Sequence, residues 1–344
     1  MEITDKLLRE LALLTETDRA VLSVYLNTAQ HKDKVDEYIE KAARRLRPLL
    51  STEERGNLDD SLEFLHDFLT EKRGGGYRGP GLAFFADLGA SYVQGVELPV
   101  TPDPLLTIES EPRLFPLAML LDEYEPVGVI TVDHAGARIF VAAGKTAEDG
   151  DSLKKKIKNL VKVGGWSQMR YQRRRDKQIL HMAKDVAERA RKLFDEAGVK
   201  RIVLAGRKQM IDAVKPELPK ALAEQIIGTV AWDMKSGDDK LLEKLRPVME
   251  QAERDQEAGL LERLNGELRR NGLAVGGLKL VQDALQFGAV DTLLVSDDLD
   301  RDSKERFTRQ AEAINAHVEY FPGKPKLLTE HDGIAALLRY RSGF

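Results

Sequence analysis

The sequence predicts an α/β protein with three domains, and three observations support this fold class. The chain has 344 residues, which is more than one ordinary hydrophobic core requires. Short apolar runs, typical of buried strands, alternate along it with amphipathic helical segments. The proline-rich residues 99–116 and the polar residues 235–239 interrupt this alternation. We therefore expect domains over residues 1–123, 124–236 and 237–344.

The composition indicates a soluble globular protein. Hydrophobic residues make up 42% of the chain and charged residues 32%, so it can form cores and has a well-solvated surface. The absence of cysteine excludes disulfides, thiolate metal sites and cysteine nucleophiles. No run reaches the roughly 18 apolar residues of a membrane span, and the first residues contain no apolar signal core. We expect a cytoplasmic monomer without a membrane partner.

The first domain is expected to contain three helices and three strands. Its elements are a helix at 7–14, a strand at 20–26, helices at 35–50 and 53–71, and strands at 82–86 and 91–96. Ser51-Thr52-Glu53-Glu54 is a capping signal for the helix at 53–71. Residues 72–81 are rich in glycine and are expected to form a loop. This loop lacks the terminal Gly-Lys-Ser/Thr of a nucleotide-binding P-loop, so we interpret it as a connector.

The second domain is expected to contain a long amphipathic helix over residues 169–197. Strands are expected at 127–132 and 138–142 before it, then a strand at 201–205, a short helix and a strand at 226–232. One face of the long helix is apolar, with Ile179, Met182, Ala183, Val186, Ala190, Leu193 and Phe194 at offsets of three and four. A second face carries Arg170, Arg173, Arg174, Lys177, His181 and Lys184. The helix should therefore pack on one side and present positive charge on the other.

The third domain is expected to be a small α/β sandwich. Its elements are a long helix at 240–270, a strand at 274–275, a helix at 278–286, a strand at 290–296, a helix at 303–313, a strand at 317–321 and a final helix at 333–340.

A strongly basic segment surrounds Gly164-Gly165 in the second domain. Residues 152–184 contain eleven Lys or Arg residues and one acidic residue, Asp176. This segment carries about +10 although the chain as a whole carries −4, so the remainder carries about −14. Positive charge concentrated around a glycine loop favours contact with a polyanion such as a nucleic acid. The alternative is a solvated helix face. The candidate binding residues are Lys154, Lys155, Lys156, Lys158, Lys162, Trp166, Ser167, Arg170, Tyr171, Arg173, Arg174, Arg175 and Lys177.

Other patterns do not form convincing sites. Asp298, Asp300 and Asp302 alternate as in a calcium loop, but the loop lacks the required glycine and final glutamate. The six histidines do not show metal-ligand spacing. A hydrolytic triad of Ser167, His181 and Asp133 is supported by residue type alone, and no spacing or motif favours it. The chain also lacks a Walker motif and a dinucleotide-binding fingerprint, so we expect no metal, no cofactor and no nucleotide hydrolysis.

Two regions resemble the class-1 translation release factors of eukaryotes and archaea, together with pelota and bacterial homologues of the Vms or hibernation type. Residues 164–171, Gly-Gly-Trp-Ser-Gln-Met-Arg-Tyr, resemble the Gly-Gly-Gln-Ser-x-x-Arg-Phe loop of the release factors. Residues 275–296 and 333–340 are similar to the carboxyl-terminal domain of that superfamily. The two regions cover about half of the chain, in the same order and with the same spacing.

The resemblance implies three α/β domains arranged like a tRNA in the ribosomal A site. The expected partners are ribosomal RNA, the P-site tRNA and, as a delivering factor, a translational GTPase. Gly164 and Gly165 would let the loop approach RNA closely in the peptidyl-transferase centre. Trp166 stands where the superfamily has its catalytic glutamine, whereas Gln168 lies two residues further on, and Vms-type factors also carry a displaced glutamine. Gln168 is therefore the candidate catalytic residue.

Two functions stay open at this point. In the first, the protein hydrolyses peptidyl-tRNA on stalled ribosomes without reading a codon, and Gln168 positions the water. In the second, it is a pelota-like or hibernation factor that occupies the A site without hydrolysis, with Trp166 stacked on a base. Trp166 could also pack on its own domain. Stop-codon decoding is not expected, because the first domain lacks the Asn-Ile-Lys-Ser signature.

Overall fold

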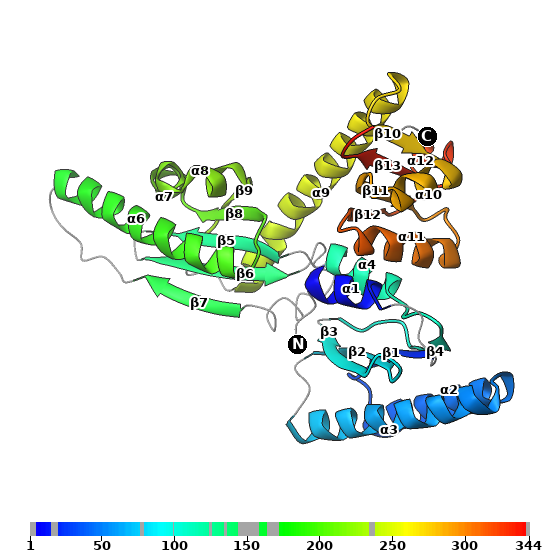
Figure 1. The fold of residues 1–344 in the computed structure, drawn as a ribbon. Coiled ribbons are helices and arrows are strands. Elements are labelled where there is room, and N and C mark those ends of the chain that lie inside the picture. Colours follow the sequence, from blue (N-terminus) through cyan, green and yellow to red (C-terminus); the bar gives the residue numbers. More distant parts are fainter. Residues whose placement is uncertain are drawn as a thin grey trace. The chain divides into compact units, whose positions relative to one another are not determined.

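The computed structural model describes residues 5–14, 20–75, 79–98, 100–123, 126–133, 136–143, 158–163, 172–233 and 238–341. Helices alternate with strands in three separate sheets (Figure 1), so the predicted α/β fold class is confirmed. The chain forms two compact units. One unit combines residues 1–122 with 261–344, and the other comprises residues 123–260.

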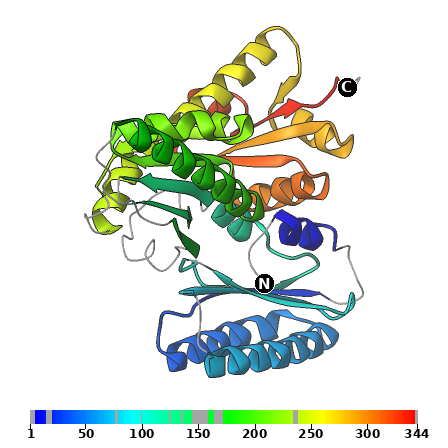
Figure 2. The same ribbon diagram turned by 90° about the vertical axis from the view of Figure 1, so that its left-hand side faces the viewer.

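The amino-terminal sheet is antiparallel and has the strand order β3-β2-β1-β4. Its strands are β1 (Val21–Asn27), β2 (Gly81–Asp87), β3 (Tyr92–Leu98) and β4 (Leu105–Glu109). The helices of this part are α1 (Asp5–Ala12), α2 (Lys32–Leu46), α3 (Thr52–Gly75) and α4 (Phe115–Glu123), with a short 3-10 turn at Arg47–Leu49. Figure 2 shows α2 and α3 covering one face of the sheet. Alternate residues of β1, among them Leu22 and Val24, meet Leu58 and Leu65 of α3 in this core.

The predicted capping signal of α3 is confirmed. The Ser51 backbone N–H donates to a carboxylate oxygen of Glu54 at 2.7 Å, and the Glu54 N–H donates to Ser51 Oγ at 3.2 Å. The predicted loop at 72–81 is wrong in its first part, because α3 continues to Gly75. Two contacts support this extension: the Lys72 ammonium lies 5.4 Å from the Phe68 ring, and Arg73 pairs with Asp36 of α2 at 2.6 Å.

The sheet of the middle unit has the strand order β7-β6-β5-β8-β9. Its strands are β5 (Pro126–Val132), β6 (Ala137–Ala143), β7 (Lys158–Val163), β8 (Arg201–Gly206) and β9 (Ile226–Ala231). The helices are α6 (Gln172–Glu196), α7 (Lys208–Val214) and α8 (Lys220–Glu224), with a 3-10 turn at Lys215–Glu217. Strands β5, β8 and β9 are parallel, whereas β6 is antiparallel to both β5 and β7.

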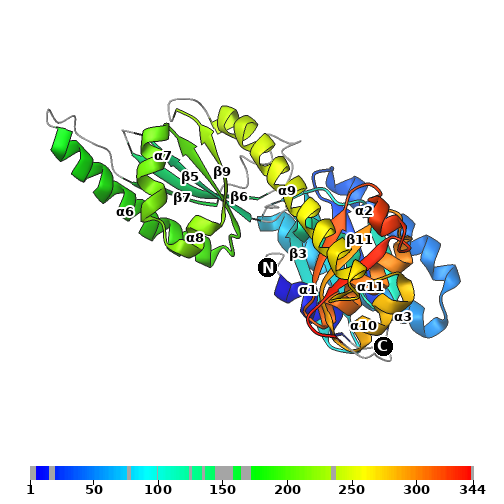
Figure 3. The same ribbon diagram turned by 90° about the horizontal axis from the view of Figure 1, so that it is seen from above.

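Each face of the middle sheet carries its own core. Ile130 and Val132 of β5 pack with α6, α7 and α8, whereas Val127 and Val129 pack with the first half of α9 (Asp238–Arg269). Figure 3 shows these helices around the middle sheet. Arg201 at the start of β8 pairs with Glu253 of α9 at 2.6 Å. The first half of α9 therefore packs within the middle unit, and the third-domain boundary expected at residue 237 lies at the start of this helix.

The carboxyl-terminal sheet has the strand order β10-β13-β11-β12. Its strands are β10 (Ala274–Gly276), β11 (Val290–Ser296), β12 (His317–Phe321) and β13 (Ile334–Leu338), and its helices are α10 (Leu278–Gln286), α11 (Arg301–Ala313) and α12 (Lys326–Thr329). The predicted final helix at 333–340 is wrong, because residues 334–338 form strand β13 between β10 and β11. All five residues of β13 are buried. A strand buried on both faces is continuously apolar, and periodicity alone does not distinguish such a run from a buried helix.

Candidate RNA-binding site

Gly164 and Gly165 lie between β7 and α6 in the sequence of the middle unit. Strand β7 ends at Val163 and α6 begins at Gln172. Several predicted site residues lie outside the described residues: Lys154, Lys155, Lys156, Gly164, Gly165, Trp166, Ser167, Gln168, Arg170 and Tyr171. Their assignment to the site stays a prediction. The structure describes the strand and the helix that flank them.

Strand β7 lies at one edge of the middle sheet and contains Lys158 and Lys162. Its register with β6 places Lys162 opposite Arg138 and Lys158 opposite Val141. Two cationic positions therefore lie opposite each other on neighbouring strands beside the loop. The guanidinium of Arg138 lies 5.8 Å from the Phe140 ring. Strand β7 was not predicted from the sequence, although lysines are common on edge strands, where they oppose pairing with other chains.

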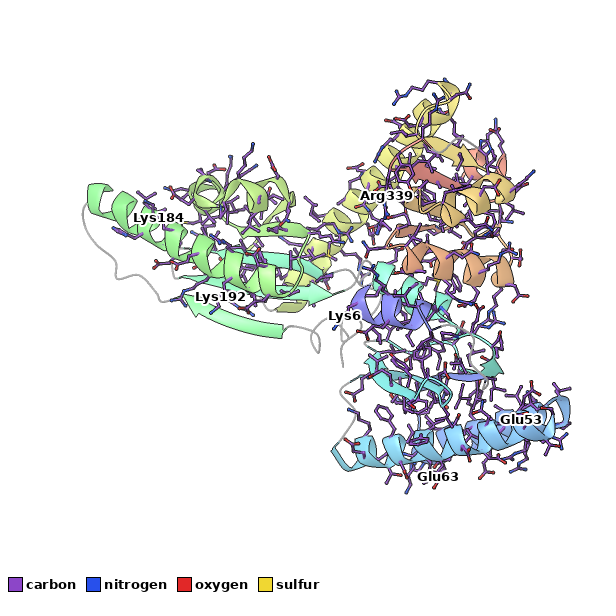
Figure 4. The ribbon with its side chains drawn as sticks, in the orientation of Figure 1. Lys6, Glu53, Glu63, Lys184, Lys192 and Arg339 are labelled. Atoms are coloured by element: carbon purple, nitrogen blue, oxygen red, sulfur yellow. The ribbon has the colours of Figure 1, made fainter. Side chains whose placement is uncertain are left out.

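Helix α6 packs through the apolar stripe predicted from its sequence. Ile179, Met182, Ala183, Val186, Ala190, Leu193 and Phe194 are all buried in the core beneath the helix. Gly128 of β5 leaves room for the Phe194 ring, because a Cβ atom there would lie 2.7 Å from that ring. His181 and Lys184 are exposed, and Lys184 and Lys192 are labelled on the helix in Figure 4. Arg173, Arg174, Arg175 and Lys177 occupy the first two turns, immediately after the loop.

The charge of α6 is concentrated at the end next to the loop. Residues 172–184 include five basic residues and one acidic residue, whereas residues 185–196 include three basic and four acidic residues. The first turn has no acidic residue. Cations at a helix amino terminus oppose the helix dipole, so this distribution does not stabilise the helix itself. An external polyanion would gain from both the cations and the positive end of the helix dipole.

The other patterns considered in the sequence have structural roles where they are described. Asp300 caps α11 by accepting the Ser303 N–H at 2.9 Å, and Asp298 accepts a hydrogen bond from Thr329 at 2.6 Å. Asp133 accepts the Gly136 N–H at 3.0 Å in the β5–β6 turn. Within the described ranges, no group of three or more His, Asp or Glu side chains could hold a metal ion. None of the helices described is long and apolar enough to cross a membrane.

Two protein-family models match adjoining parts of the chain. Residues 112–257 match bacterial archaeo-eukaryotic release factor family 10. Residues 255–342 match eRF1 domain 3. The first match contains β7, α6 and the loop between them, and the second contains the carboxyl-terminal sheet.

Archaeal proteins named peptide chain release factor subunit 1 are similar in sequence. The one from Thermococcus onnurineus is 30% identical over 197 residues, which are 54% of this chain and 47% of that protein. The one from Methanocaldococcus jannaschii is 26% identical over 323 residues, which are 86% of this chain and 74% of that protein. The chain thus spans about half the length of the former relative.

Solved structures of pelota-type proteins are similar at lower identity. Archaeal Pelota in a model bound to the ribosome with ABCE1 is 15% identical, with a TM-score of 0.48 over 99% of this chain and 95% of that chain. Dom34 of S. cerevisiae, described as a translation termination-like factor, is 16% identical, with a TM-score of 0.46 over 77% of this chain and 75% of that chain.

Proposed function

We propose that this chain, which belongs to the release factor and pelota superfamily, binds the ribosomal A site and releases nascent chains from stalled ribosomes without reading a codon. The observation that carries this proposal is the position of Gly164-Gly165 between β7 and the basic end of α6. Cationic positions on both flanks suit ribosomal RNA and tRNA phosphates, and such binding weakens as salt rises.

The chemistry of the proposed reaction is hydrolysis of an ester. Water attacks the carbonyl carbon that joins the peptide to the tRNA, the bond to the tRNA 3′ oxygen breaks, and a proton passes to that oxygen. The two glycines permit close approach to RNA, and Gln168 is the side chain that would orient the water. Stabilisation of the developing oxyanion supplies the rest of the rate enhancement.

A second function follows from Trp166. This residue stands where the release factors have their catalytic glutamine, so the loop could occupy the A site without hydrolysis. Stacking of an indole on a base contributes about 1–3 kcal/mol to binding, which suits a pelota-like or hibernation factor.

Replacement of Gln168 separates the two functions. We expect Gln168→Ala to lower the rate of peptide release on stalled ribosomes by about 10²–10³ while ribosome affinity is unchanged, because one positioned group in such a centre contributes that much. Gln172→Ala, four residues further on at the start of α6, is the matched control and should release peptide like the wild type. Trp166→Ala should weaken binding. If the wild type binds the A site but releases no peptide above buffer, hydrolysis is excluded and occupancy takes its place.

A further inference from the structure

A buried carboxylate joins two parts of the chain that are far apart in sequence. Glu305 of α11 is only 5% exposed, and its two carboxylate oxygens accept the backbone N–H groups of Leu114 at 2.5 Å and Phe115 at 3.1 Å. Because α4 begins at Phe115, the carboxylate caps this helix from another part of the fold. It satisfies N–H groups that have no partner within the helix, and its negative charge suits the positive end of the helix dipole.

Charged contacts reinforce this junction on both sides. Arg113 donates to Glu109 of β4 at 3.0 Å and to Asp302 in the first turn of α11 at 3.3 Å. Arg309, one turn beyond Glu305, pairs with Glu111. Residues 109–115, which we call the strap, are thus bound to successive turns of α11.

Aromatic side chains also pack at this junction. The rings of Phe115 and Tyr320 meet edge to face, with centroids 5.3 Å apart. The Lys304 ammonium lies 5.6 Å from the centre of the Phe115 ring. Tyr320 also hydrogen-bonds Thr308 of α11 at 2.7 Å.

The strap is also hydrogen-bonded to the first sheet. The buried Tyr25 of β1 donates its hydroxyl hydrogen to the Arg113 carbonyl at 2.7 Å, and the Arg113 N–H donates to Ser23 Oγ at 3.0 Å. Helix α1 also lies against α11, as Figures 1 and 2 both show. One short segment therefore connects the centre of the first sheet to a helix of the third.

Because the Glu305 carboxylate is buried, we expect the contacts of this junction to form and break together. Desolvation raises the pKa of Glu305, whereas the two amide hydrogen bonds and Arg113 lower it, and the net shift is upward. A buried carboxylate that loses its partners is strongly destabilising, so the strap cannot leave α11 by small steps. We propose that Glu305 latches the strap onto α11, so that the first and third sheets form one rigid body. A partner that binds either sheet then also sets the orientation of the other.

The proposal can be tested on the full chain by measuring a distance across the junction. The chain has no cysteine, so Glu63→Cys on α3 and Lys279→Cys on α10, both at exposed positions, allow a single pair of spin labels. With Glu305 intact we expect a narrow distance distribution between the two spin labels. With Glu305→Gln we expect a broad one, because the side-chain NH2 group of Gln would face a backbone N–H group and cannot accept its hydrogen bond. Glu330→Gln, an exposed carboxylate after α12 that pairs with Lys326, is the matched control and should leave the distribution narrow.

A second measurement covers the case in which Glu305→Gln fails to fold. In the unmodified chain, amide hydrogen exchange at Leu114 and Phe115 should be as slow as in β1. Exchange there at the rate of an exposed loop would overturn the proposal. A broad distance distribution in the chain with Glu305, or an equally narrow one in the folded Glu305→Gln variant, would also overturn it.

Discussion

At the scale of single residues, Asp298 shows how a carboxylate holds the loops at one end of the third sheet. It accepts hydrogen bonds from Lys324 at 2.8 Å, after β12, and from Thr329 at 2.6 Å, at the end of α12. Gly333, with a φ of 77°, lies close behind it, because a Cβ atom there would be 3.2 Å from the Asp298 Cβ. One side chain thus connects three loops that follow different strands and helices.

These contacts predict a dependence of stability on pH. The hydrogen bond from Lys324 and then that from Thr329 lower the pKa of Asp298 below its ordinary value. A carboxyl group whose pKa is lower in the folded chain stabilises the fold above its unfolded pKa, and this contribution is lost as the pH falls through the folded pKa. We expect Asp298→Asn to lower the free energy of unfolding at neutral pH and to flatten its decline in acid.

Urea unfolding over a series of pH values measures this effect. The control is Glu330→Gln, which removes an exposed ion pair with Lys326 of 3.7 Å, and such pairs contribute little. The assigned role of Asp298 is wrong if its variant loses stability in acid as steeply as the wild type does.

At the scale of elements, the agreement between sequence and structure depends on how a segment is buried. The pattern of α6 was predicted correctly because a helix buried on one side repeats its apolar residues every three or four positions. Strand β13 was not predicted correctly. Because Ile334–Leu338 is buried on both faces, its residues do not alternate between apolar and polar. Strand β4 and helix α4 were not predicted, because the prolines of residues 99–116 were interpreted as an interruption between domains.

The two halves of α6 provide a test of the electrostatic part of the proposed function. We expect the triple replacement of Arg173, Arg174 and Arg175 by Glu to weaken sedimentation with ribosomes and to reduce its dependence on salt. Removing one ion pair with a phosphate should change the slope of log affinity against log salt concentration by about 0.7–0.9. The matched control replaces Arg189, Arg191 and Lys192 by Glu on the second half of the same helix, and it should bind like the wild type. If the variant at residues 173–175 sediments with ribosomes as well as the wild type does at every salt concentration, the basic end does not contact RNA.

At the scale of the whole molecule, local sequence patterns predict a candidate site, but they do not predict the junction between the first and third sheets. Residues 164–171 are predicted as a site because glycine and clustered charge are local signals. They lie outside the described residues, so this stays a prediction, and the cationic positions of β7 and α6 flank them in the sequence. The pairing of Glu305 with Leu114 joins residues 191 positions apart. In the sequence, Glu305 is one charged residue among several on a helix, and nothing local indicates that it is buried.

The absence of a decoding signature leads to a prediction for the intact protein. The first domain contains no Asn-Ile-Lys-Ser sequence, and one face of its sheet is covered by α2 and α3, so specific contacts with a stop codon are not expected. Phosphate contacts through the middle unit would instead dominate affinity, and these contacts are independent of codon identity. We therefore expect affinities for ribosomes with a stop codon, a sense codon or an empty A site to agree within about tenfold, or about 1.4 kcal/mol. Equilibrium binding to the three ribosome preparations at one salt concentration measures this, with an archaeal release factor as the stop-codon-dependent control. A strong preference for the stop codon would identify the protein as an ordinary termination factor and would contradict the proposed rescue of stalled ribosomes.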